Sequence, residues 1–143
     1  MSSNRRSAFT LIEILIVVVI MAVLAATIIP QFTDSQKDAR ESTALFNLNT
    51  LRSQIELYKA QHGGALPNAS LTDLTSTTTY GGKSFAPYMV TIPENPVSGS
   101  TAVKAAAGST VVVGDVTAGD TGGWIYSSAS GEVRLDHTTL WTK

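Results

Sequence analysis

The chain has 143 residues, a formal net charge of −1 at pH 7 and no cysteine. This length suggests one folded domain beside any membrane segment, and so small a charge does not indicate a nucleic-acid-binding surface. The absence of cysteine from these residues excludes a disulfide, a cysteine nucleophile and a cysteine-ligated metal within them.

The first predicted element is an apolar stretch, Phe9 to Ile29, in which Glu13 is the one charged residue. As a helix it would be roughly 30 Å long, which matches the hydrocarbon core of a bilayer. Arg5 and Arg6 stand just before it. The positive-inside tendency therefore places residues 1–8 in the cytoplasm and the rest of the chain across the membrane.

Glu13 is unusual in such a stretch, because an ionised carboxylate at the centre of a membrane span costs roughly 2.5–3.5 kcal/mol, and less near an end. The helix dipole favours a carboxylate in the first turn, but a further interaction should offset the cost. A cleaved secretory signal fits poorly, because the apolar run exceeds the usual length of about 7–15 residues. An uncleaved single-span anchor is the better alternative.

Residues 5–13 read RRSAFTLIE. This sequence resembles the class III signal of type IV pilins and type II secretion pseudopilins, which has a basic leader, a small residue and FTLIE at the start of an apolar helix. The resemblance implies cleavage by a prepilin peptidase between Ala8 and Phe9, and N-methylation of Phe9. The family usually has glycine where this chain has Ala8. The resemblance also implies that Glu13 pairs with the Phe9 amine of a neighbouring subunit and so orders assembly into a filament.

One long helix is predicted from about Thr10 to His62, roughly 80 Å in length, because no glycine interrupts it. Pro30 should remove one backbone hydrogen bond and kink or loosen the helix near the membrane exit. The resemblance implies that this proline helps filament packing, and a plain kink without a function is an equal alternative. Gly63 and Gly64 would end the helix, and Pro67 prevents its resumption.

Beyond Pro30 the helical pattern becomes amphipathic. Apolar residues recur at spacings of three and four and so form one stripe of the helix. They are Ala44, Leu48, Leu51, Ile55 and Tyr58. The charged residues between them should face outward, so the stripe is predicted to be the face on which the globular domain folds.

The region after the helix contains several loops. Residues 70–73, Ser-Leu-Thr-Asp, have the capping-box form and predict a short helical turn, and residues 75–84 are predicted to form an exposed loop. Three prolines in residues 85–96 exclude a regular helix and argue against a central strand. This segment resembles the loop that joins the helix to the sheet in pseudopilins, which implies a structural role.

The last third of the chain supplies the sheet. Residues 98–108 are rich in Ala, Gly and Ser and predict a flexible loop or variable surface, and residues 110–117 contain three consecutive valines and predict a strand. Leu140 and Trp141 are expected to pack as a final cover.

The clearest hairpin joins residues 123–128 to residues 132–136 through a three-residue turn that ends in Gly131. Val133 and Leu135 alternate with polar residues, so the second strand should have one buried and one solvated face. The resemblance implies an α+β, pilin-like fold. In it, a small antiparallel sheet of three or four strands packs across the outer half of the long helix.

Four parts are therefore predicted. The resemblance implies that residues 1–8 are a leader peptide, and residues 9–29 are expected to be the transmembrane half of the helix. Residues 30–62 are expected to form its amphipathic half, and residues 63–143 a periplasmic region of loops and sheet.

Four acidic residues could supply oxygen ligands to Ca²⁺. They are Asp115, Asp120, Glu132 and Asp136. The resemblance implies such a site in major pseudopilins, but the acidic cluster they use is not evident here. Solvated surface acids are the preferred interpretation, so no cofactor and no metal site is predicted.

No group of residues predicts catalysis. Ser127, Ser128, Asp136 and His137 could be assembled on paper into a hydrolase triad, but no nucleophile elbow surrounds them. His62, at the predicted helix end, is explained as a partner of the last carbonyl groups.

The resemblance implies a structural subunit of a type II secretion pseudopilus, assembled from the bacterial inner membrane to drive protein export. Its partners would be other copies of itself in a homopolymer, minor pseudopilins, the prepilin peptidase, the inner-membrane assembly platform and, before assembly, membrane lipid. The major subunit is favoured. Two alternatives remain: a type IV pilus subunit for adhesion, motility or DNA uptake, and a membrane-anchored binding module that never polymerises.

Overall fold

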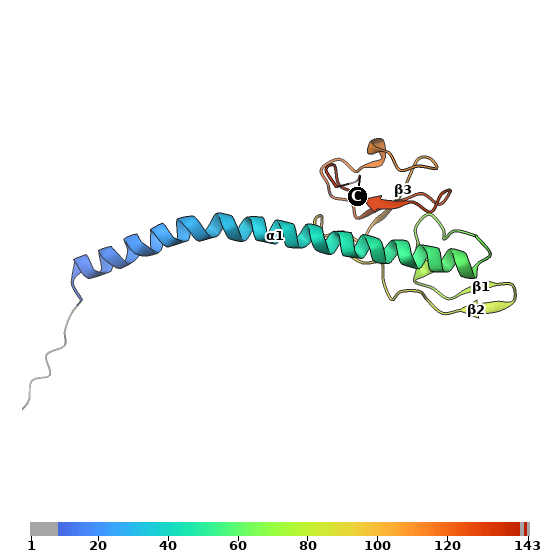
Figure 1. The fold of residues 1–143 in the computed structure, drawn as a ribbon, viewed down its shortest axis with the longest axis horizontal. Coiled ribbons are helices and arrows are strands. Elements are labelled where there is room, and N and C mark those ends of the chain that lie inside the picture. Colours follow the sequence, from blue (N-terminus) through green and yellow to red (C-terminus); the bar gives the residue numbers. More distant parts are fainter. Residues whose placement is uncertain (1–8, 141, 143) are drawn as a thin grey trace, which may run out of the picture. The chain divides into compact units, whose positions relative to one another are not determined.

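The computed structural model describes residues 9–140 and 142. These residues form a long helix, α1 (Leu11–Gln61), and two 3-10 helices, η1 (Thr72–Leu74) and η2 (Val113–Asp115). The strands are β1 (Thr78–Tyr80), β2 (Lys83–Phe85), β3 (Val103–Ala105), β4 (Trp124–Tyr126) and β5 (Val133–Leu135). The predicted α+β, pilin-like fold, a long N-terminal helix packed on small sheets, is confirmed (Figure 1).

The chain divides into two compact units, one that ends at Asp38 and one that begins at Ala39. The apolar stretch lies in the first unit, and all the named strands lie in the second. Helix α1 contributes its residues 11–38 to the first unit and its residues 39–61 to the second. The divisions predicted at residues 29–30 and 62–63 stay predictions.

The end of α1 matches the prediction to within one residue. The helix ends at Gln61, and Gly63 and Gly64 follow with φ of +63° and +93°. The amide of Gly64 donates to the carbonyl oxygen of Lys59 at 2.8 Å, which satisfies a carbonyl of the last turn. A Cβ atom at Gly63 would lie 2.1 Å from the Tyr80 hydroxyl oxygen, so glycine also makes room for the β1 hairpin.

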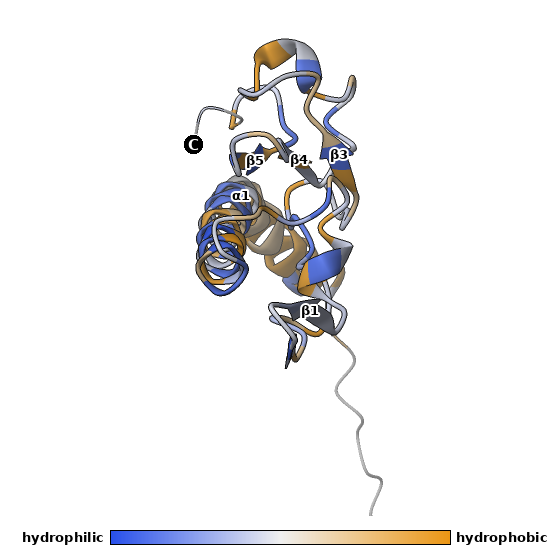
Figure 2. Cartoon of the chain, turned by 90° about the vertical axis from the view of Figure 1, so that its right-hand side faces the viewer, coloured by the Kyte–Doolittle hydropathy of each residue, from blue (hydrophilic) through white to orange (hydrophobic). Residues whose placement is uncertain are grey.

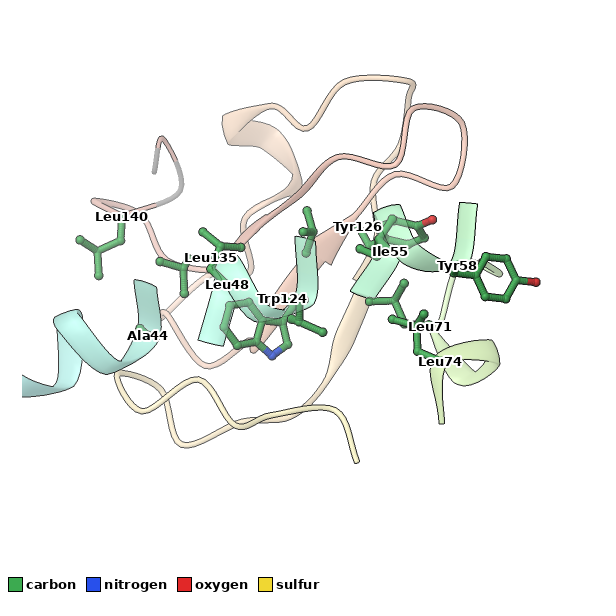
Figure 3. Packing of buried hydrophobic residues seen from close by; sticks show 12 residues of the cluster. Ala44, Leu48, Ile55, Tyr58, Leu71, Leu74, Trp124, Tyr126, Leu135 and Leu140 are labelled. Atoms are coloured by element: carbon green, nitrogen blue, oxygen red, sulfur yellow. The ribbon is translucent and has the colours of Figure 1, made fainter. Parts of the chain in front are cut away.

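The core of the second unit is the predicted helix stripe together with the sheet (Figure 3). Every residue of the predicted stripe is buried. Its partners in the core are Leu71, Leu74, Trp124, Tyr126, Val133, Leu135 and Leu140. Full burial of one such aliphatic or aromatic side chain contributes roughly 1.5–3 kcal/mol, so this cluster is the main stabilising element of the unit. Leu140 packs as predicted, whereas Trp141 lies outside the described residues.

The larger sheet has the order β3-β4-β5 (Figure 2). Strands β4 and β5 pair antiparallel, with Trp124 opposite Leu135, as the predicted hairpin requires. Strand β3 pairs with β4 in parallel, with Val103 opposite Trp124. The sheet has the predicted number of strands, but it is mixed instead of antiparallel throughout.

The prediction of a strand at residues 110–117 is wrong, because this segment holds η2 instead. The carboxylate of Asp115 accepts the backbone N–H of Val112 at 2.9 Å, and the amide of Asp115 donates to the Val112 carbonyl at 2.9 Å. Such local bonds compete with a sheet ladder and close a turn. The strand beside β4 comes from residues 98–108, which were predicted to form a loop or variable surface.

Two shorter segments also differ from the sequence prediction. Residues 75–84 contain β1 and the turn to β2, an antiparallel hairpin, where an exposed loop was expected. The short turn predicted at residues 70–73 is present as η1, but Ser70 does not cap it. Its N-cap residue is Leu71, which makes no side-chain cap hydrogen bond. The Oδ1 atom of Asn68 accepts the amide of Thr72 at 2.9 Å, and the amide of Asn68 donates to the Asp73 carboxylate at 2.8 Å.

The proline-containing segment 85–96 ties the sheet to the rest of the second unit. The indole N–H of Trp124 donates to the carbonyl oxygen of Pro93 at 2.8 Å. The side-chain amide of Asn95, itself fully buried, donates to the carbonyl oxygen of Gly123 at 3.1 Å. The segment therefore has the structural role that was predicted for it.

Candidate functional site

Glu13 and Thr10 form the N-terminal cap of α1. The amide and hydroxyl of Thr10 donate to Glu13 Oε2 at 2.7 and 2.8 Å, and the amide of Glu13 donates back to the Thr10 hydroxyl oxygen at 3.3 Å. This reciprocal arrangement is a capping box, which satisfies two backbone donors that the helix cannot satisfy itself. Glu13 thus has a partner inside its own chain.

The sequence analysis missed this cap, although a signal for it was present. Threonine followed three residues later by glutamate, just before an apolar run, is the pattern of a capping box. Thr10 and Glu13 fit that pattern and also lie inside the FTLIE motif. The role of Glu13 in the cap and its predicted role in assembly are compatible, because these three hydrogen bonds use only one oxygen of the carboxylate, Oε2, and the Thr10 hydroxyl.

The surface around this cap is apolar and accessible. Phe9 is 81% exposed, and each residue from 11 to 29 is exposed. Helix α1 is long and apolar enough to cross a membrane by length and composition, and its most apolar part is not buried within the described chain. An apolar surface of this extent needs lipid or another protein to cover it.

The roles predicted for Ala8, Phe9, Glu13 and Pro30 stay predictions. Ala8, on the leader side of the predicted cleavage, lies outside the described residues. Helix α1 passes through position 30, and the kink expected at Pro30 stays a prediction.

The acidic residues considered as calcium ligands each accept hydrogen bonds from nearby groups. Asp115 accepts the amides of Ala107 and Val112 at 3.0 and 2.9 Å. Asp136 accepts the amide and hydroxyl of Thr117, both at 2.6 Å. Asp115 and Asp136 are 4% and 1% exposed, so the prediction of solvated surface acids is wrong for both. They are buried because the amides of the loop around η2 need acceptors.

The other two acids also have local partners. Asp120 accepts the amide and hydroxyl of Thr138 at 2.6 and 2.9 Å. Glu132 accepts the amide of Val111 at 2.9 Å and the Arg134 side chain at 2.6 Å. Among the described residues, no three His, Asp or Glu side chains lie close enough together to hold a metal ion.

His62 is part of an aromatic cluster at the end of α1. It is buried and stacks on Tyr58, with ring centroids 3.9 Å apart. Its Nδ1 lies 3.0 Å from the Tyr58 carbonyl oxygen, and its Nε2 lies 3.0 Å from the Thr78 hydroxyl. His62 therefore does meet a carbonyl of the last turn, but it also joins the β1 hairpin to the helix.

The residues named as a hydrolase triad have structural contacts instead. The Ser127 hydroxyl is buried and donates to the carbonyl oxygen of Gly108 at 2.9 Å. Asp136 is engaged by Thr117, and His137 lies 3.8 Å from Asp120. These contacts stabilise loops and supply no activated nucleophile.

We expect Asp115→Asn to lower the free energy of unfolding by about 1–2 kcal/mol at neutral pH, because an amide has one oxygen and leaves one loop N–H without an acceptor. Bonds from the Val112 and Ala107 amides lower the pKa of Asp115 below its ordinary value. The carboxylate therefore stabilises the fold above about pH 4, and this contribution is lost as the pH falls through the lowered pKa.

The difference in the free energy of unfolding between the natural chain and Asp115→Asn should therefore be largest near pH 7 and shrink as the pH falls through the lowered pKa of Asp115. Denaturant titrations of the full chain in detergent across this range measure it. Asp38→Asn, at an exposed position of α1, is the matched control and should change little. A difference for Asp115→Asn that does not vary with pH would contradict this account.

Residues 3–29 match the family described as the prokaryotic N-terminal methylation motif. The matched segment contains the predicted cleavage position, Phe9 and Glu13. The predicted resemblance to pilins and pseudopilins is therefore confirmed for the N-terminal part of the chain.

Curated relatives extend the resemblance beyond this motif. The chain is 36% identical over 56 residues to type II secretion system core protein G of Dickeya chrysanthemi, covering 39% of this chain and 37% of that protein. It is 36% identical over 59 residues to the protein of the same name from Pseudomonas aeruginosa, covering 41% and 42%. The Escherichia coli protein of that name is 28% identical over 79 residues, 54% of each chain.

The chain thus spans about two fifths of the length of the first two relatives. No solved structure gives a significant match.

Proposed function

We propose that this chain is a structural subunit of a type II secretion pseudopilus, with the major subunit as its role. The observation that carries the proposal is the methylation motif at residues 3–29, joined to an apolar helix whose surface is exposed in the single chain. Such a helix can be held by lipid first and by other copies later. The name of the relatives, type II secretion system core protein G, supports the same role.

The proposed pathway has three steps. The apolar stretch holds the precursor in the inner membrane, with residues 1–8 cytoplasmic and the second unit periplasmic. A prepilin peptidase cuts between Ala8 and Phe9, and the new amine on Phe9 is methylated. The subunit then joins a homopolymer on an assembly platform, together with minor pseudopilins, and filament growth pushes cargo outward.

In the filament, Glu13 pairs with the Phe9 amine of a neighbouring subunit. The capping box supports this proposal because it holds the carboxylate at the start of α1, close in sequence to the residue that would carry the new amine. Pairing of the two charges would offset the cost of removing each from water. The proposed role is mechanical and not enzymatic.

A type IV pilus subunit is the alternative within the same superfamily, and the names of the curated relatives favour the pseudopilus. A membrane anchor that does not polymerise is the alternative outside it. That alternative predicts an uncut N-terminus and no dependence on Glu13.

Peptide mass spectrometry of the full chain from its native membranes tests the proposal. We expect the N-terminal tryptic peptide to run from Phe9 to Lys37 and to carry one added methyl group, because trypsin would otherwise cut after Arg6 and leave Ser7 at the start. Ala8→Val, which enlarges the residue before the cut, should accumulate the uncut precursor. Ala8→Gly is the matched control and should be processed at least as well as the natural chain.

Recovery of the uncut N-terminus from cells with an active prepilin peptidase would contradict the proposal. The non-polymerising anchor would then be the better account.

A further inference from the structure

The loop between η2 and β4 is joined to the residues that follow β5 by two reciprocal contacts. The Asp136 carboxylate accepts the amide of Thr117 on Oδ1 and its hydroxyl on Oδ2, both at 2.6 Å. The Asp120 carboxylate accepts the amide and the hydroxyl of Thr138 in the same way, at 2.6 and 2.9 Å. Each segment thus supplies one aspartate and one threonine. We call this pair of contacts the Asp–Thr clamp.

The backbone around the clamp is shaped to make these contacts. The amide of Asp120 donates to the carbonyl oxygen of Thr117 at 3.3 Å and closes a turn that carries both residues. Asp120 has φ of +52°, a left-handed conformation that aspartate adopts more readily than most residues. Gly122 leaves room for the other carboxylate, because a Cβ atom there would overlap Asp136 Oδ2. The clamp is therefore part of the local fold.

The resemblance to major pseudopilins implies a calcium site among these acids, and the donor set of the clamp does not fit one. Ca²⁺ takes about six to eight oxygen ligands, several of them from carboxylates. Both oxygens of Asp120 and of Asp136 instead face N–H or O–H groups, which present positive charge where a cation would bind. The His137 ring nitrogen Nε2 also lies 3.8 Å from Asp120 Oδ2. No three acidic or histidine side chains of the described chain lie close enough to share a metal ion.

The hydrogen bonds of the clamp can do what a shared cation does in a calcium site. A cation satisfies carboxylates from two segments and so joins the segments. In the clamp, four hydrogen bonds to carboxylate oxygens join residues 117–120 to residues 136–138. Hydrogen bonds to an ionised group are roughly twice as strong as those between neutral groups. The two segments are therefore held together by groups of the chain itself.

We propose that the Asp–Thr clamp closes the loop between η2 and β4 without calcium, so that Ca²⁺ contributes nothing to the folding of the second unit. Amide and hydroxyl donors of the chain take the part that the resemblance assigns to a cation. The proposal concerns folding and does not depend on the proposed function. If the chain is a pseudopilus subunit, its supply of folded copies is independent of the calcium concentration.

Denaturant titrations of the full chain in detergent, with CaCl₂ or with excess EGTA, test the first part of the proposal. A cation that binds only the folded chain raises its stability as the cation concentration rises. We expect the unfolding midpoint to be the same in both solutions, and calorimetric titration with CaCl₂ to show no saturable binding. A midpoint that rises with the CaCl₂ concentration would overturn the proposal.

Amide hydrogen exchange at Thr138 tests the clamp itself. Asp120→Gly removes the carboxylate and tolerates the left-handed backbone, so this amide should exchange about ten-fold faster or more, with or without CaCl₂. Ala118→Gly is the matched control, because it adds the same backbone freedom to the same loop and keeps the carboxylate. It should leave the exchange at Thr138 nearly unchanged. Equal exchange in the two variants, or faster exchange of the natural chain in EGTA, would overturn the proposal.

Discussion

Replacing Glu13 by glutamine should abolish incorporation into filaments and leave the start of α1 intact. Glutamine can accept the Thr10 amide as glutamate does, and both residues serve in capping boxes. What glutamine lacks is the charge. If the carboxylate offsets the burial of a neighbouring Phe9 amine, its neutral replacement leaves that amine buried without a counter-charge, at a cost of roughly 3–5 kcal/mol. Such a cost corresponds to a loss of more than about a hundred-fold in the equilibrium for addition of one subunit.

Thr10→Ala is the matched variant, because it removes the cap and keeps the carboxylate. It deletes the hydroxyl bonds to Glu13 and should cost about 1 kcal/mol in the first turn. Filament yield, measured by electron microscopy and by pelleting of sheared filaments, should fall far less than for Glu13→Gln. Membrane insertion of both variants should equal that of the natural chain. Equal losses in the two variants would assign the importance of Glu13 to the cap and not to assembly.

The parts of the fold that the sequence predicted well are those set by neighbours along the chain. The helix could be placed because its stripe has the helical period from Ala44 to Tyr58 and because glycines follow His62. The hairpin could be placed because β4 and β5 are joined by a short turn ending in Gly131, which has φ of +82°. In each case the information lies within a few residues.

The parallel strand β3 could not be placed in this way. Its partner β4 begins about twenty residues later, and a parallel pair has no tight turn to mark it. The segment Val103-Lys104-Ala105 has little strand preference, whereas the three valines at 111–113 have much more. Hydrogen bonds to Asp115 turn the valine segment away, and only tertiary structure reveals those bonds.

In the candidate site, too, the features set by local sequence could be predicted and those that depend on distant partners could not. Residue type and spacing were enough to single out Glu13 and the processing position, because the motif is local. The capping box was also readable from Thr10 and Glu13. The partner proposed for the Glu13 carboxylate belongs to another copy of the chain, so no single chain can display it.

Gly123→Ala should lower the free energy of unfolding by about 2–3 kcal/mol, because it forces away the backbone of residues 100–102, which leads directly into β3. A Cβ atom at this position would lie 2.6 Å from the carbonyl oxygen of Ala102 and 2.7 Å from that of Ser100. Both are backbone atoms, which cannot rotate aside as a flexible side chain can. The shift would also strain the bond at 2.9 Å from the Trp124 amide to the Ala102 carbonyl, and Trp124 is fully buried in the core.

Gly108→Ala is the matched control. It makes the same substitution in the same unit and separates the steric clash at Gly123 from the general effect of replacing glycine by alanine. A Cβ atom at Gly108 would meet nothing within 4 Å. The free energy of unfolding of this variant should therefore lie within about 0.5 kcal/mol of that of the natural chain, or be slightly higher. Denaturant titrations of both full chains in detergent, followed by near-ultraviolet circular dichroism, give the comparison. Equal stability of the two variants would mean that residues 100–102, which lead into β3, do not lie against Gly123. The local sequence did not predict the parallel pairing of β3 with β4. This pairing depends on the absence of a side chain at Gly123, because one added methyl group there would clash with the backbone that leads into β3.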